Sequence, residues 1–145
     1  MFEKYCYGTK SGELALKASQ VKRIELGVTL CGAQKIRTLN REYRGKDKST
    51  DVLSFPVFED LRPGSEERDF LTPVLDLGDV LICREKVYEQ AKRFELPPLA
   101  EALHLIAHGF LHVCGYDHER SDAEEQVMQR LEDKLVKAMY EKVGY

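Results

Sequence analysis

The segment HLIAHGFLHVCGYDH, residues 104–118, contains every histidine of the chain: His104, His108, His112 and His118. Chance would rarely place all the histidines of a protein within one such short segment, so the cluster calls for a chemical explanation. Apolar residues between the histidines predict a helix over about residues 99–113. Gly115 predicts its end, because glycine readily adopts the left-handed conformation that terminates helices.

The spacing of the histidines selects which of them can share a metal ion. On an unbroken helix, His104 and His112 lie about 12 Å apart along the axis, which two metal–nitrogen bonds of about 2.1 Å cannot span. His108 and His112 are one turn apart on one face, a spacing that suits two ligands of one ion. A turn at Gly115 can bring His118 back as the third. The sequence therefore predicts a metal site of His108, His112 and His118.

Three histidine ligands leave a fourth tetrahedral position open, which is typical of catalytic rather than structural zinc. One Zn²⁺ is the expected ion, although other divalent metals also accept imidazole. Two alternatives carry less weight. His104 and His108 could form the ligand pair, but they lack a sensible third ligand. The segment could also be an ordinary histidine-rich helix without a metal.

The pattern H-x3-H-x2-G-x2-H matches the extended metalloprotease signature in its three histidines and its glycine. Gly109 stands where that signature has the catalytic glutamate, so the general base of a peptidase is missing. We therefore expect a metalloprotease-like metal site without peptidase chemistry. His104 is expected to be a packed helix residue, with a place behind the ligands or along a substrate groove as the alternative. Asp117 could orient a ligand histidine or cap the turn.

Hydrophobic periodicity outward from this segment predicts an α+β fold, because strands interleave with helices early and helices dominate late. The expected strands are 2–7, 24–30, 51–57 and 80–83, the last after a turn at Gly78–Asp79. The expected helices are a weak one at 11–21 and others at about 36–43, 85–95, 99–113 and from Ser121 onward. Ser121 and Glu124 have capping-box spacing at the start of the last helix.

Composition limits the class of protein. A chain of 145 residues with 43% hydrophobic and 32% charged residues fits one folded domain, residues 1–145. A net charge of −3 argues against a general nucleic-acid-coating protein. We expect no membrane span and no signal peptide. The four cysteines are far apart without a C-x-x-C pair, which indicates free thiols and a cytoplasmic location.

Three segments carry a family resemblance: HGFLHVCGYDH (108–118), LNREYRGKDKSTDVLSFP (39–56) and LGDVLIC (77–83). Together they resemble the YbeY family of bacterial rRNA-maturation endoribonucleases. Small departures are Ser49, where proline is common, and Val113–Cys114, where leucines are usual. The resemblance implies a metal-dependent, single-strand-specific endoribonuclease that acts with the ribosome, chiefly on the 3′ end of small-subunit rRNA, and in ribosome quality control. It also implies a mixed four-stranded sheet with about five helices, and no organic cofactor.

The segment 37–48 is locally basic, with five Lys or Arg against two acidic residues, an excess of three positive charges. From charge alone, a solvated helix end is the favoured interpretation. The resemblance favours function for Arg44, which could clamp the scissile phosphate or offset its developing charge. Ser54 and Asp51 could shape the pocket, although structural roles are at least as plausible.

Two other functions stay open at this stage. A metallohydrolase of peptides or small amides would need a carboxylate near the ion to replace the one missing at Gly109. A non-catalytic ribosome-assembly factor would use zinc only to stabilise its fold, and would fill the fourth coordination position with protein.

Overall fold

A computed structural model of the chain describes residues 22–62 and 73–144. The elements in these ranges are β1 (Arg23–Cys31), α2 (Ala33–Arg44), β2 (Val52–Pro56), β3 (Val74–Cys83), α3 (Arg84–Arg93), α4 (Pro98–Val113) and α5 (Asp122–Val143). The described part thus has three strands and four helices, in place of the expected four and about five. The strand expected at 2–7 and the weak helix at 11–21 lie outside the described residues.

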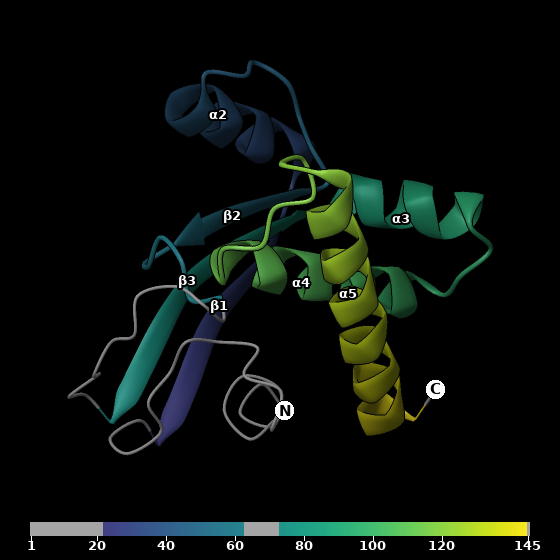
Figure 1. Cartoon of the computed structure of the whole chain (residues 1–145). Coiled ribbons are helices and arrows are strands. Elements are labelled where there is room, and N and C mark those ends of the chain that lie inside the picture. The colour runs from purple at the N-terminus through teal and green to yellow at the C-terminus, as the bar shows by residue number, and fades with distance from the viewer. Residues whose placement is uncertain (1–21, 63–72, 145) are drawn as a thin grey trace.

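The sheet is mixed, as predicted. Its order is β1-β3-β2, with β1 parallel and β2 antiparallel to β3. Figure 1 shows α4 beside the sheet, α5 crossing α4 on its outer side, and α2 at the other end of the molecule. No helix within 22–62 and 73–144 has both the length and the apolar character that crossing a membrane requires.

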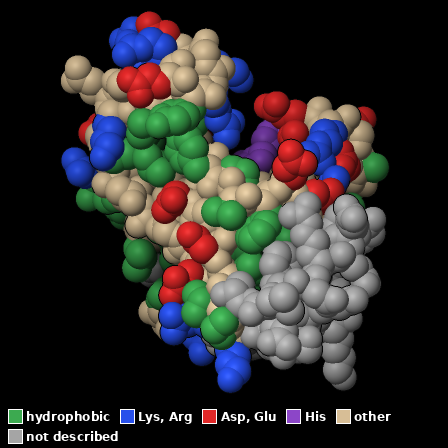
Figure 2. Space-filling view, turned by 90° about the vertical axis from the view of Figure 1, so that its left-hand side faces the viewer, with side chains coloured by type: hydrophobic (Ala, Val, Ile, Leu, Met, Phe, Trp, Pro, Cys, Tyr) green, Lys and Arg blue, Asp and Glu red, His purple; other side chains and the backbone are tan. Residues whose placement is uncertain are grey.

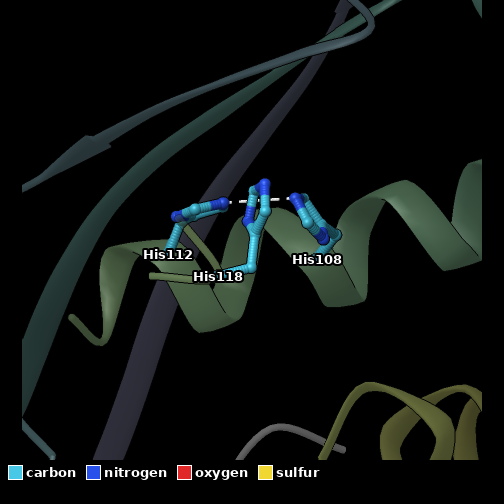
Figure 3. Close-up of side chains that lie close together, drawn as sticks. All are labelled: His108, His112 and His118. Carbon is cyan, nitrogen blue, oxygen red and sulfur yellow. Dashed lines mark hydrogen bonds between the residues drawn. The ribbon is translucent and has the colours of Figure 1, made fainter. Parts of the chain in front are cut away.

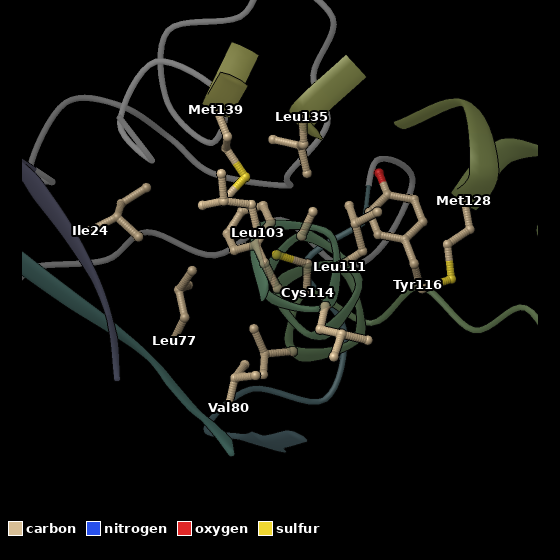
Figure 4. Packing of buried hydrophobic residues seen from close by; sticks show 14 of the residues in the cluster. Ile24, Leu77, Val80, Leu103, Leu111, Cys114, Tyr116, Met128, Leu135 and Met139 are labelled. Atoms are coloured by element: carbon tan, nitrogen blue, oxygen red, sulfur yellow. The ribbon is translucent and has the colours of Figure 1, made fainter. Parts of the chain in front are cut away.

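The larger core surrounds α4, which is packed on two sides. In Figure 4, Leu77 and Val80 approach α4 from the sheet, and Leu135 and Met139 approach it from α5. A smaller cluster on the opposite sheet face, beneath α2, consists of Cys31, Ile36, Leu53 and Cys83. The helix that carries three of the histidines is therefore the best-anchored helix in the described part of the fold.

Two strand predictions need correction. β3 continues through Gly78, so the predicted turn at Gly78–Asp79 is wrong. Position 78 requires glycine for two reasons. Its φ is +121°, and β2 is so close that a Cβ would lie 2.1 Å from the carbonyl oxygen of Phe55. In β1 the predicted alternation fails after the register shift between Glu25 and Gly27, because a bulge changes which face the next residues point to. Leu30 is consequently 51% exposed.

The helix predictions hold more closely. α2, α3 and α4 begin and end within a few residues of the expected positions. The hydroxyl of Ser121 accepts a hydrogen bond from the backbone N–H of Glu124 at 3.1 Å, which confirms the N-cap predicted for α5. This cap fixes where the chain leaves the turn that contains His118.

Candidate metal centre

The turn after α4 forms as its glycine predicts. Gly115 has φ +104°, and its N–H donates to the carbonyl of His112 at 3.0 Å. The segment before residue 63 braces this turn, because the N–H of Leu61 donates to the carbonyl of Cys114 at 2.9 Å. Asp60 lies so close that a Cβ on Gly115 would be 2.8 Å from its Oδ1. The chain is thereby directed back across the end of α4 and carries His118 with it.

His108, His112 and His118 converge (Figure 3). Nε2 of His108 and Nε2 of His112 are 3.1 Å apart, close to the roughly 3.4 Å that two nitrogens 2.1 Å from a tetrahedral ion would have. The ring of His118 has its centroid 5.3 Å from each of the other two. One nitrogen from each ring can be chosen so that all three lie within 4.8 Å of one another. The three rings are therefore arranged as a group that could hold one metal ion.

The chemistry of this donor set also fits a cation. Nδ1 of His118 is buried and has no hydrogen-bond partner in the described structure, an unusual state for a buried polar atom. Burial, together with the neighbouring rings of His108 and His118, lowers the pKa of His112 to about 4. A neutral ring with a free lone pair is the form that coordinates metals. Two metal–nitrogen bonds of about 2.1 Å span at most about 4.2 Å, so a bound ion would draw the rings slightly closer.

Glu132 on α5 supports the centre from behind, and the sequence analysis missed it. Its carboxylate is almost fully buried and contacts Nδ1 of His108 at 2.8 Å and Nε2 of His104 at 2.5 Å. Burial would raise the pKa of Glu132, but its bonds to the two histidines lower it to about 2. An ionised carboxylate there accepts Nδ1–H of His108 and so directs the Nε2 lone pair toward His112. His104 is thus a partner of Glu132, and it does not join the three converging rings.

Gly109 and Ser54 join α4 to the sheet. A Cβ at Gly109 would lie 2.6 Å from Cγ1 of Val80, so even alanine is tight and a glutamate has no space. The hydroxyl of Ser54 donates to the carbonyl of Gly109 at 3.2 Å. The position that holds the catalytic glutamate in metalloproteases is therefore a packing contact here. Ser54 makes this contact and also lines the cleft that contains the three histidines, as expected for a residue that shapes the pocket.

The three histidines lie in a cleft of about 630 Å³. Its lining includes the cations Arg44, Lys46, Lys48 and Arg120 and the acids Asp51, Glu59, Asp117 and Glu119. In Figure 2 histidine side chains are visible in a hollow between the α2 end of the molecule and a group of charged side chains. Arg44, at the end of α2, donates from Nη2 to the carbonyl of Ser54 at 3.1 Å. Arg44 and the two lysines give the α2 wall of the cleft its positive charge.

Other charged residues neutralise one another. Arg37 donates to Asp47 at 3.0 Å and Arg41 lies 3.7 Å from the same carboxylate, so both of these arginines are drawn to Asp47. Of the five cations in 37–48, Arg44 and the two lysines are the ones that line the cleft. Asp117 accepts from the N–H of Glu119 at 2.9 Å and lies 3.7 Å from Arg120. These contacts fit the turn-capping alternative for Asp117.

These features define a class: an α+β protein with a three-histidine candidate metal centre at the floor of a cleft that has one basic wall. Comparison with known proteins narrows the class. Residues 9–140 match the family model described as endoribonuclease YbeY. The chain therefore belongs to the YbeY family.

Individual relatives agree with this assignment. An endoribonuclease YbeY of Persephonella marina is 41% identical over 85% of this chain and 75% of its own. One of Leptospira interrogans is 39% identical over 79% of this chain and 86% of its own. The solution structure of TM1509 from Thermotoga maritima is similar with a TM-score of 0.55 and 31% identity, covering 82% of this chain and 70% of that one.

Proposed function

We propose that this chain is a zinc-dependent endoribonuclease that cuts single-stranded rRNA, chiefly at the 3′ end of small-subunit rRNA, in ribosome maturation and quality control. The observation that carries the proposal is the convergence of His108, His112 and His118 beside the basic wall of a cleft. Membership of the endoribonuclease YbeY family supports the reaction type.

The residues of the cleft would have different roles in RNA cleavage. Zinc held by the three histidines would supply a Lewis acid to polarise a phosphoryl oxygen and lower the pKa of a water molecule. Glu132 holds His108 in the tautomer that coordinates. Arg44, fixed by its bond to the Ser54 carbonyl, can bind the scissile phosphate through its planar fork and offset the charge that develops there. Lys46 and Lys48 can contact neighbouring phosphates.

Two observations weigh against the alternatives. Peptidase activity would require a catalytic glutamate at position 109, and Val80 occupies the space that such a side chain would need. For a purely structural zinc site, a fourth protein ligand is expected. Within 22–62 and 73–144, no further His, Cys, Asp or Glu joins the three histidines as a fourth ligand. The donor set therefore favours a centre with an open position.

We further propose that residues 1–145 act as one domain in the cytoplasm, with single-stranded rRNA and ribosomal proteins as partners. The match of residues 9–140 to a single family model supports one domain. The basic α2 wall supports an RNA partner.

The test combines metal analysis with cleavage of a single-stranded RNA that contains the 3′ end of small-subunit rRNA. We expect about one zinc per chain, cleavage that stops with chelator, and recovery on adding zinc. His112→Ala should lose both metal and cleavage. Arg44→Glu should keep the metal and lose cleavage, while Arg130→Glu, an equal charge reversal on the exposed side of α5, should retain both. Cleavage by metal-free protein, or full activity of Arg44→Glu, would contradict the proposal.

A further inference from the structure

A second pocket adjoins the cleft. It has a volume of about 430 Å³, within the range of about 300–1,000 Å³ that is typical of small-ligand sites. His108 and Asp51 line both cavities, so the second pocket begins beside the candidate metal centre. The other lining residues are Gln90, Phe94, Leu96, Glu101, His104, Leu105 and Glu132. A strand that passes the centre can therefore place part of a neighbouring nucleotide in this pocket.

The charges of the two cavities differ in a way that matches the two parts of a nucleotide. The cleft has Arg44 and two lysines on one wall, whereas the second pocket has three carboxylates and no Lys or Arg in its lining. Carboxylates repel a phosphate, so the part of a nucleotide that can enter the pocket is its uncharged base. The pocket also offers Phe94, which is 55% exposed, and Leu96 as apolar surface. Aromatic and apolar side chains are the usual platforms for unstacked bases of single-stranded RNA.

Glu101 is the polar residue of the pocket that is available to a ligand. The residue is only 4% exposed as a whole, and within the described part of the chain no hydrogen bond to its carboxylate affects its pKa. The other two carboxylates are occupied: Glu132 by two histidines, and Asp51 by Nε2 of Gln90 at 3.3 Å. Glu101 lines the pocket, where a ligand can reach its carboxylate. Glu101 therefore has capacity for a ligand that brings N–H groups.

We propose that this pocket binds one nucleobase of the RNA next to the cut, and that Glu101 selects guanine. An ionised carboxylate only accepts hydrogen bonds. Burial raises the pKa of Glu101, and N–H donors from a ligand would favour its ionised form. The Watson–Crick edge of guanine carries two adjacent donors, N1–H and N2–H, which match the two oxygens of one carboxylate. Adenine and cytosine offer one amino group each, and uracil presents two carbonyls beside its single N–H. The inference rests on the proposed function, since it requires single-stranded RNA in the cleft.

The test measures binding of RNA decamers to the full chain in chelator, which prevents cleavage. The decamers are all-uridine, or all-uridine with one central guanosine, adenosine or cytidine. Wild-type protein should bind the guanosine decamer about tenfold or more tightly than all-uridine RNA. Glu101→Gln should abolish most of that difference. Glu89→Gln, an exposed glutamate on α3, serves as the matched control and should retain it.

A second variant keeps the test decisive if Glu101→Gln does not fold. Phe94→Ala removes a half-exposed ring and should weaken binding of the guanosine decamer about tenfold through lost stacking, with a smaller effect on all-uridine RNA. Equal binding of the four decamers by wild type, or a guanine preference that survives Glu101→Gln, would overturn the base pocket alone. Unchanged binding of the guanosine decamer by Phe94→Ala would do the same. A wild-type chain that neither binds nor cuts any of these RNAs would overturn the proposed function as well.

Discussion

Replacing Glu132 by glutamine should weaken zinc binding while the protein stays folded. The carboxylate accepts a hydrogen bond from Nδ1 of His108 at 2.8 Å and is nearly fully buried. A hydrogen bond to a charged group contributes about 1.5–3 kcal/mol, against about 0.5–1.5 kcal/mol for a neutral one. The midpoints of these ranges differ by about 1.25 kcal/mol, which corresponds to roughly an eightfold loss of zinc affinity. Glu132→Ala removes the partner altogether, so its loss should approach the roughly 100-fold end of the range for such supporting residues.

The assay is a competition titration of zinc against a chromophoric chelator at pH 7, with thermal unfolding of the metal-free protein measured in parallel. The metal-free protein should lose some stability in Glu132→Gln, because the lowered pKa of Glu132 means that the fold stabilises its charge, so zinc affinity is measured well below the Tm of the variant. Glu125→Gln, an exposed glutamate on the same helix, is the control and should bind zinc like wild type. Wild-type affinity in Glu132→Gln would refute the argument that this carboxylate tunes His108.

Three further predictions concern the frame around the centre. Gly109→Ala should lower the Tm by roughly 3–6 °C, because crowding against Val80 outweighs the helix propensity gained; an unchanged Tm would show that Val80 moves aside freely. Ser121→Ala should cost about 1 kcal/mol, or about 3 °C in Tm, by removing the bond to the N–H of Glu124; a calorimetric scan checks it, and no change would mean that water replaces the cap. The hydrogen bond from Arg62 lowers the pKa of Asp60, so this pair should stabilise the fold at neutral pH and lose its effect as acid protonates Asp60 below pH about 4. The Tm gap between wild type and Asp60→Asn should therefore narrow from pH 7 to pH 3, and a constant gap would contradict this account.

The local part of the candidate site was predictable from sequence. His108, His112, Gly115 and His118 lie within eleven residues, so helix geometry and one glycine turn were enough to expect their convergence. The capping of α5 by Ser121 was equally local. Such predictions depend on a few neighbouring residues and need no knowledge of the tertiary fold.

The parts that failed or were missed depend on contacts between distant segments. Glu132 reaches His108 from 24 residues away. One signal was available: Glu132 lies between Met128 and Leu135 on the apolar stripe of its helix, where a charged residue calls for a buried partner. Gly78 was interpreted as a turn because its close approach to Phe55 arises only once β2 and β3 pair. Likewise, the exposure of Leu30 follows from a bulge that the alternating pattern does not reveal.

The three imidazoles of the candidate metal centre belong to parts of the chain that are packed to different extents. Two belong to a helix enclosed by the sheet and α5, whereas His118 belongs to a surface turn held by Gly115 and the bracing contact from Leu61. Opening that turn disturbs far less packing than moving the helix. We therefore expect His118 to control metal exchange. An incoming ion would bind first to His108 and His112, and it would dissociate when the ring of His118 moves away. The half-life of the proposed metal-loaded centre should then depend on the turn, and the lifetime of the fold should depend on the core.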